Sequence, residues 1–193
     1  MPVPPGVVLD ASVLFPAAMR ETLFRAAVLR LYDACLSEEI LDELHRSLIN
    51  TGRSNRQSAR RLIDAIHTAF PDSIKTERKY SRLIPQMQNH PKDRHVLALA
   101  VATGSKSIVT SNLGHFPESI LAPMGITALH PDVFLSNLFE EAPAIMAELV
   151  QAQAAALKTP PMTVQDVIAV LHNQGAPRFA VLVKQFLDLQ RAQ

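Results

Sequence analysis

Short apolar segments alternate with longer amphipathic segments along most of this chain, and that alternation limits the folds it can adopt. Residues 7–9 are apolar and predict a buried strand, and further strands are expected at 74–77, 107–110 and 126–129. Between these segments, apolar residues recur at helical spacing. Strands that alternate with helices favour an α/β fold with a parallel central sheet.

Several of the expected helices have recognisable ends. Ser37 followed by two acids is typical of a helix start, because serine caps free N–H groups and acids interact favourably with the helix dipole. Gly104 is typical of a helix end. The pattern predicts helices over residues 21–32, 37–50, 54–70, 91–104 and 132–139.

The pair Pro160–Pro161 marks a boundary near the C-terminus. Beyond it, residues 163–173 and 177–189 predict two amphipathic helices joined at Gly175, an αα-hairpin. We therefore expect an α/β domain over residues 1–141 and a helical C-terminal extension over residues 142–193.

Composition excludes several classes of protein. Hydrophobic residues make up 48% of the 193 positions, which is enough for a core, and the formal net charge is only +1, so nucleic-acid binding would need a local patch. The single cysteine excludes an internal disulfide framework and a cysteine metal cluster. No apolar run approaches the roughly 18–20 residues of a membrane span, and the N-terminus lacks a secretory pattern. We expect a soluble, cytoplasmic protein.

Asp10 lies between two apolar runs in the segment GVVLDASVLFP. A buried carboxylate needs a partner or a cation, because an unpaired buried charge is very costly. Ligands of open parallel sheets bind at the carboxyl ends of the strands, where Asp10 would lie. Capping of the following segment is an equally good interpretation of this one residue.

Two further acids are candidates for the same site. Asp93 shares a helix face with Val96 and Leu97, although an acid in the first helical turn is also an ordinary dipole partner. Glu38 and Glu43 flank an apolar stripe at similar angles, so periodicity does not choose between them.

Oxygen ligands also follow the strand at 107–110. Thr110 and Asn112 would emerge at the same edge as Asp10, although the segment is also a good turn. With Asp93, and with Glu43 as a further candidate, these groups predict a Mg²⁺ or Mn²⁺ site and not a zinc site, because hard cations prefer oxygen ligands.

Four stretches together resemble the PIN-domain ribonucleases, specifically the VapC-like toxins of type II toxin–antitoxin systems. They are VVLDASVLFP, SEEILDEL, HPKDRHVLALAV and IVTSNLGHFP, in the family's order, and the resemblance covers roughly residues 6–140. The stretch HPDVFLSNL adds a resemblance to a subgroup with a helical C-terminal extension.

The resemblance implies a three-layer fold, with a parallel sheet flanked by helices, and a metal-dependent endoribonuclease. Such an enzyme hydrolyses RNA with a metal-activated water, inhibits translation, forms a homodimer and is neutralised by a cognate antitoxin. By position, Asp10, Glu43 and Asp93 match the family's three principal acids, which favours Glu43 over Glu38. Asn112 stands where the family often has a fourth acid. Thr110 and Ser12 are expected to support the site.

Basic residues are concentrated between positions 51 and 82. They would contact RNA phosphates, or they form a solvated or antitoxin-facing surface. The candidate RNA contacts are Arg53, Arg56, Arg60, Arg61 and Arg94.

The histidines follow no metal-ligand motif. His95, beside Asp93, is either a contact near the scissile bond or a surface histidine. No role is predicted for His45, His67, His90, His115, His130 or His172.

Three other functions compete with the nuclease. One is an interaction module in which the helical segment 163–190 docks a partner, although its apolar residues would equally pack on the parent domain. A phosphohydrolase using Asp10 as nucleophile would want a second aspartate where this chain has Ser12. A catalytically weakened PIN-like module that binds RNA or protein is supported only by Asn112.

Overall fold

The computed structural model describes residues 4–192, and these residues form two compact units. The first unit contains the chain up to Phe15 together with Tyr32–Leu129. The second contains Pro16–Leu31 together with the chain from His130 onward. Each unit is described separately below.

The predicted limits of the domains, 1–141 and 142–193, follow the linear chain and stay a prediction. The compact units follow a different division, since an early helical segment and the first helix after residue 129 group with the C-terminal helices.

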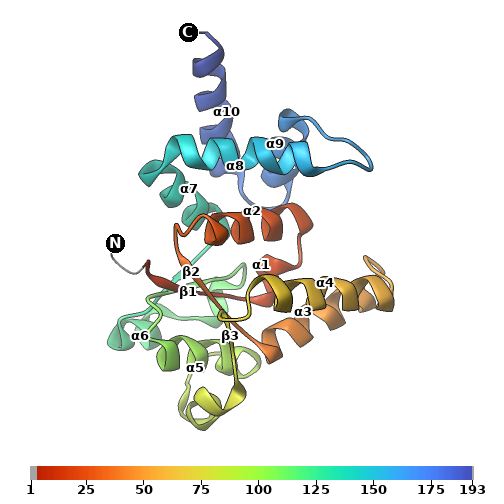
Figure 1. Ribbon diagram of the computed structural model, residues 1–193. Helices are drawn as coiled ribbons and strands as arrows, with labels where there is room; N and C mark the ends of the chain where they lie inside the picture. Colours follow the sequence, from red (N-terminus) through yellow and green to blue (C-terminus); the bar gives the residue numbers. More distant parts are fainter. Residues whose placement is uncertain (1–3, 193) are drawn as a thin grey trace. The chain divides into compact units, whose positions relative to one another are not determined.

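A five-stranded parallel sheet forms the centre of the first unit, in the order β3-β2-β1-β4-β5 (Figure 1). The sheet confirms the predicted α/β fold. β2 and β3 follow on one side of β1, and β4 and β5 follow on the other side, so the strand order reverses between β1 and β4. The strands are β1 (Gly6–Leu9), β2 (Asp33–Ser37), β3 (Ile74–Lys75), β4 (Ser107–Val109) and β5 (Thr127–Leu129).

β2 is absent from the predicted strands. Its sequence, DACLS, has a polar residue at each end, and its last residue also caps the next helix. The central place of β2 in the sheet, between β1 and β3, buries Ala34, Cys35 and Leu36 and makes this segment a strand. Tertiary pairing therefore decides its structure, and local propensity does not.

α5 (Arg94–Thr103) covers one face of the sheet and contacts β1, β2 and β4 (Figure 1). Its apolar residues from Val96 to Ala100 have no exposed surface, and each large side chain contributes ~1.5–3 kcal/mol by burial. The helix ends at Gly104, whose φ of 67° is the left-handed conformation that glycine adopts readily. The predicted helix over 91–104 is thus confirmed, with its first turn in 3₁₀ form.

α3 and α4 run side by side in the same unit (Figure 1). Ser37 caps α3 by accepting the N–H of Ile40, and Asn55 caps α4 by accepting the N–H of Ser58. The α-helices of this unit are α1 (Ala11–Leu14), α3 (Glu38–Asn50), α4 (Arg56–Ala69), α5 (Arg94–Thr103) and α6 (Glu118–Leu121). Its 3₁₀ helices are η1 (Glu77–Lys79), η2 (Ser81–Gln86), η3 (Pro91–Asp93), η4 (Leu113–His115) and η5 (Ala122–Met124).

The second unit is helical. α8 packs against α2, α7 and α9, and α10 packs against α7 and α9. A buried hydrogen bond of 2.7 Å from Thr22 to Gln153 joins α2 to α8. The helices are α2 (Ala17–Val28), α7 (Pro131–Glu141), α8 (Pro143–Ala156), α9 (Val164–Asn173) and α10 (Pro177–Arg191).

The predicted C-terminal hairpin is confirmed as α9 and α10, which are joined through Gly175. The helix expected over 21–32 lies earlier, at Ala17–Val28. It stops there because Arg30 has a φ of 61°, which a right-handed helix cannot accommodate.

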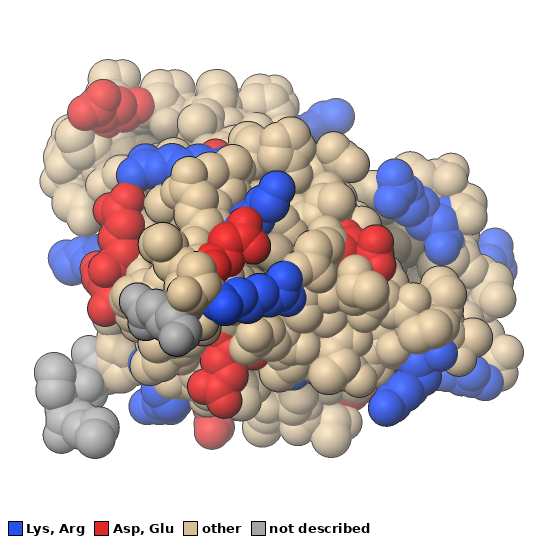
Figure 2. All heavy atoms as spheres, turned by 90° about the horizontal axis from the view of Figure 1, so that it is seen from above, with Lys and Arg blue, Asp and Glu red and all other residues tan. Residues whose placement is uncertain are grey.

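The charges are mixed in sign. Figure 2 shows basic and acidic side chains interspersed on one face of the molecule, among a larger area of uncharged surface. Within residues 4–192, no helix combines the length and the apolar character that crossing a membrane requires.

Candidate functional site

A cleft of about 700 Å³ in the first unit collects the predicted acids. Asp10, Glu43 and Asp93 all line it, and they come from the end of β1, from α3 and from η3. β1 and β4 end beside it at the point where the strand order reverses, which is the usual ligand position in an open parallel sheet.

Asp10 is held by two hydroxyl groups. It is 2% exposed, and its Oδ2 accepts hydrogen bonds from Ser12 Oγ at 2.6 Å and from Thr110 Oγ1 at 2.7 Å. Asp10 precedes α1, but its side chain makes no capping hydrogen bond, so the capping interpretation is wrong. Among interactions of the described residues, Oδ1 receives no side-chain donor and is the oxygen left for a ligand.

Glu43 projects from α3 into the same cleft. Burial raises the pKa of its carboxyl group above the ordinary value, and the negative charges of Asp10 and Asp93 act in the same direction, against His95 and Arg46. Glu43 therefore lies close enough to Asp10 and to Asp93 to be repelled by both of their charges. A divalent cation would relieve that repulsion.

Glu38, the alternative to Glu43 by periodicity, pairs with His67 at 3.4 Å and does not line the cleft. Next to Glu43, His95 Nε2 lies 3.7 Å from the carboxylate oxygen Oε2. His95 is only 8% exposed, so the surface interpretation of this histidine is wrong.

Asp93 is 8% exposed and lies where η3 meets α5. Its Oδ2 is 2.5 Å from His115 Nδ1 and 3.6 Å from His90 Nδ1. No role for either histidine follows from the sequence, since they are separated by 25 positions and follow no ligand motif. The sequence holds one clue to their position: His90 is three residues before Asp93 in HPKD, and His115 is three residues after Asn112 in NLGH.

Thr110 and Asn112 occupy different positions at the end of β4. Thr110 is fully buried behind Asp10, whereas Asn112 is exposed and lines the cleft. The backbone N–H of Asn112 donates to Thr110 Oγ1 at 3.0 Å, which orders the turn after the strand. Asn112 therefore adds an amide to the cleft.

The cations that line the cleft are Arg46 and Lys92, and neither was among the predicted RNA contacts. Of the predicted arginines, Arg53 lies against a residue of the cleft lining, because its guanidinium is 5.3 Å from the ring centre of Phe15. The sequence does not single out Arg46, because it occupies an exposed position of a helix, where arginine is common.

The other predicted arginines lie outside the lining of the cleft. Arg60 forms an exposed ion pair with Asp64 at 3.4 Å, and Arg56 and Arg61 are exposed on α4. Arg94 donates to the carbonyl of Asn89 at 3.5 Å. A role in RNA binding stays a prediction for all five arginines.

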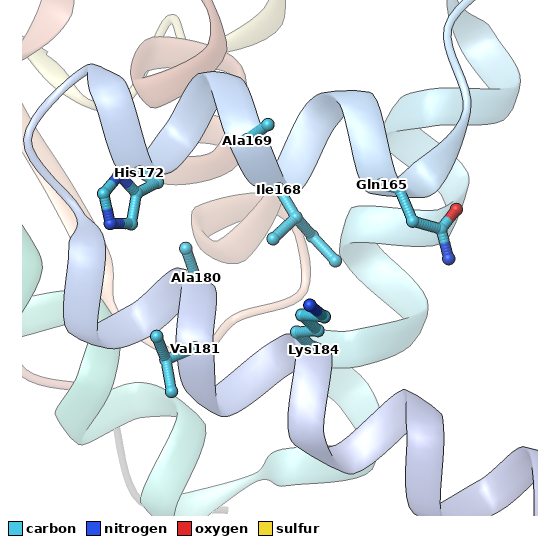
Figure 3. Close-up of a pocket in the computed structure, with 7 residues that line it drawn as sticks. All are labelled: Gln165, Ile168, Ala169, His172, Ala180, Val181 and Lys184. Atoms are coloured by element: carbon cyan, nitrogen blue, oxygen red, sulfur yellow. The ribbon is translucent and has the colours of Figure 1, made fainter.

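The donor set of the cleft fits a hard divalent cation. It contains three carboxylates and the amides of Asn50 and Asn112, and Asp10 is nearly fully buried with a carboxylate oxygen free. A second hollow, of about 310 Å³, lies between α9 and α10. Among the residues that the structure describes, no carboxylate lines it, so it lacks the ligands of a hard cation. Figure 3 shows Ile168 of α9 and Lys184 of α10 directed toward that space.

Two family models match the chain. Residues 6–114 match the model described as PIN domain, and residues 131–185 match the model described as VapC50 C-terminal domain. The second match begins at the first residue of α7.

A curated relative matches part of the chain. It is named "Putative ribonuclease VapC50", from Mycobacterium tuberculosis (strain ATCC 25618 / H37Rv), and is 44% identical over 110 residues. The match covers 55% of this chain and 62% of the relative, so it spans less than two thirds of the relative's length. No solved structure matches the chain.

Proposed function

Because the chain belongs to the PIN-domain family, we propose that it is a metal-dependent endoribonuclease, a VapC-like toxin that hydrolyses RNA phosphodiester bonds. The observation that carries the proposal is the meeting of Asp10, Glu43 and Asp93 in one cleft, where burial, and then the charges of the two aspartates, raise the pKa of Glu43. The relative that covers part of the chain is itself named a ribonuclease, which supports the assignment.

Asp10 and Asp93 would be the principal ligands of Mg²⁺ or Mn²⁺, with Glu43 and Asn112 completing the set. Once bound there, such a cation supplies charge neutralisation at the phosphodiester and a water of lowered pKa. Ser12 and Thr110 keep Asp10 in a fixed orientation, because both hydroxyls donate to its Oδ2.

Glu43 is the carboxylate suited to accept the proton of the attacking water. Burial raises its pKa, so it is a stronger base than an exposed carboxylate. Asn112 carries no charge, so its amide orients a water or a phosphate oxygen but does not act as a base. Arg46 and Lys92 would attract the phosphate backbone into the cleft.

The biological setting is proposed from the family. RNA cleavage would inhibit translation in the cytoplasm, a cognate antitoxin would neutralise the enzyme, and two copies would form a homodimer. The helical region that matches the VapC50 C-terminal domain identifies this chain with the subgroup that carries a C-terminal extension.

The test is cleavage of a structured RNA by the purified protein with Mg²⁺, with Mn²⁺ and with EDTA. Asp10→Asn and Asp93→Asn should each lower the cleavage rate at least about a hundredfold, since each removes a charged ligand. Asp64→Asn is the matched control, because Asp64 is exposed on α4 and pairs only with Arg60 in the described structure.

Equal cleavage by the parent and both site variants would refute the proposal. Retention of RNA without cleavage by any form would favour the alternative, a PIN-like module that binds RNA. Circular dichroism spectra of the variants would show that the fold is intact.

A further inference from the structure

His90, Asp93 and His115 bring two imidazoles and one carboxylate together at the edge of the cleft. One ligand atom from each residue lies within 4.8 Å of the other two. His90 lies directly before η3 and Asp93 is its last residue, whereas His115 is the last residue of η4. The fold therefore brings two separate segments of the chain together at this point.

Backbone hydrogen bonds hold the three residues in register. The N–H of His90 donates to the carbonyl of His115 at 3.2 Å, and the N–H of Asp93 donates to the carbonyl of His90 at 2.9 Å. The buried amide of Asn89 donates to the carbonyl of Asp93 at 3.0 Å. The backbones of the three residues are therefore held together by connected hydrogen bonds.

Two nitrogens of this cluster converge on one carboxylate oxygen. His115 Nδ1 lies 2.5 Å from Asp93 Oδ2, and His90 Nδ1 lies 3.6 Å from the same oxygen. The backbone N–H of Lys92 donates to His90 Nδ1 at 3.4 Å and helps to hold that ring in place. A cation at this point would be within reach of both imidazoles and of the carboxylate.

Access to the cluster is open. The side chains of His90 and His115 are 39% and 37% exposed, and their rings stack with centroids 3.9 Å apart. Asp93 is fixed beneath them, with a side chain only 11% exposed.

We propose that His90, Asp93 and His115 bind a transition-metal ion of the Zn²⁺ class, at a site that differs in chemistry from the oxygen-lined Mg²⁺ or Mn²⁺ site. Imidazole nitrogen is a preferred ligand of Zn²⁺ and a poor ligand of Mg²⁺. Two histidines and a carboxylate, with a fourth position open to water, form a recurrent zinc ligand set. The two proposed ligand sets share Asp93, and His115 also lines the cleft that contains the oxygen ligands.

The experiment measures Zn²⁺ binding to the full chain by isothermal titration calorimetry, with Co²⁺ as a spectroscopic substitute. Parent protein should bind one Zn²⁺ and give the intense visible Co²⁺ bands of a low-coordinate, nitrogen-bearing site. His90→Ala and His115→Ala should each weaken Zn²⁺ binding about tenfold or more and remove the bands. His115→Gln is a second variant that preserves more of the side-chain volume.

His172→Ala is the matched control, because His172 is an exposed histidine on α9, outside the cluster. Unchanged Zn²⁺ affinity in the His90 and His115 variants, or an equal loss in His172→Ala, would overturn the proposal. Glu43→Gln separates this proposal from the nuclease: it should weaken Mn²⁺ binding and leave Zn²⁺ binding intact. Loss of Zn²⁺ binding in Glu43→Gln would contradict two distinct ligand sets.

Discussion

Thr110 Oγ1 donates a 2.7 Å hydrogen bond to Asp10 Oδ2 and so joins the end of β4 to the end of β1. Both residues are buried, and a hydrogen bond to a charged carboxylate is stronger than one between neutral groups. The bond fixes the orientation of Asp10 at the point where the strand order reverses. The proposed metal site therefore depends on a residue that need not touch the metal.

Thr110→Val tests that dependence, because it removes the hydroxyl and keeps the side-chain shape. We expect Mn²⁺ affinity and the RNA cleavage rate to fall about ten- to a hundredfold, as when other supporting groups of metal ligands are lost. Calorimetry and a cleavage assay measure the two quantities. Thr103→Val is the control, since the Thr103 hydroxyl bonds backbone carbonyls of α5 and Ser105. Equal effects of both substitutions would show that Thr110 has only a structural role.

Asn112→Asp supplies the acid that the family often has at this position. Asn112 is exposed in the cleft, so the new carboxylate can ionise without a large desolvation cost. The added charge should tighten Mn²⁺ binding about tenfold, which corresponds to ~1.4 kcal/mol. Unchanged or weaker Mn²⁺ binding in calorimetry would place residue 112 outside the ligand set.

Glu43 makes the stability of the metal-free protein depend on pH. Burial raises its pKa above 4.5, and Asp10 and Asp93 contribute in the same direction, so the folded state binds this proton more tightly than the unfolded state. The free energy of unfolding therefore falls as the pH rises through the raised pKa of Glu43. Well below pH 4.5, Glu43 is protonated in both the folded and the unfolded states, and this loss of stability is absent.

Glu43→Gln should accordingly raise the free energy of unfolding in EDTA by about 0.5 kcal/mol at neutral pH, a small value because the side chain is partly solvated. At acid pH the gain should vanish. Denaturant titrations at the two pH values measure the difference. A gain of the same size at both would show that packing, and not ionisation, is responsible.

The parts of the fold with strong periodic patterns were predictable from the sequence. The helix around Ile40 has a capping serine and an apolar stripe, and the helix around Val96 has a continuous apolar run that ends at Gly104, so local chemistry and tertiary structure agree. β2 could not be predicted in this way, because its five residues become a strand only through pairing with β1 and β3. The positive φ of Arg30, which ends α2, also has no signal in the sequence.

The candidate site shows the same limit. Asp10 and Asp93 were predictable because a carboxylate in an apolar context needs an explanation. Periodicity left Glu43 and Glu38 equivalent, and the resemblance to a family chose between them. η4, a short 3₁₀ helix after β4, brings His115 into contact with Asp93. The spacing of these two residues along the chain does not predict that contact.

Arg46 and Lys92 provide a test of how RNA enters the cleft. Both line it, whereas Arg60 is exposed on α4 and engaged with Asp64. Arg46→Ala and Lys92→Ala should each raise KM for RNA several-fold and make binding less dependent on salt, because one phosphate contact is lost. Arg60→Ala should change neither quantity. If only Arg60→Ala weakens RNA binding in a salt titration, the arginines of α4 form the RNA surface instead.

Zn²⁺ should inhibit the Mg²⁺-supported cleavage of RNA, because a zinc ion held by His90 and His115 would engage Asp93, which the nuclease site also needs. Cleavage rates are measured at fixed Mg²⁺ with increasing Zn²⁺, and each variant is compared with its own zinc-free rate. His115→Ala should need about tenfold more Zn²⁺ for half inhibition, whereas His172→Ala should match the parent. Equal inhibition of all three proteins would mean that Zn²⁺ acts on the oxygen ligands or the RNA and not through the histidine pair.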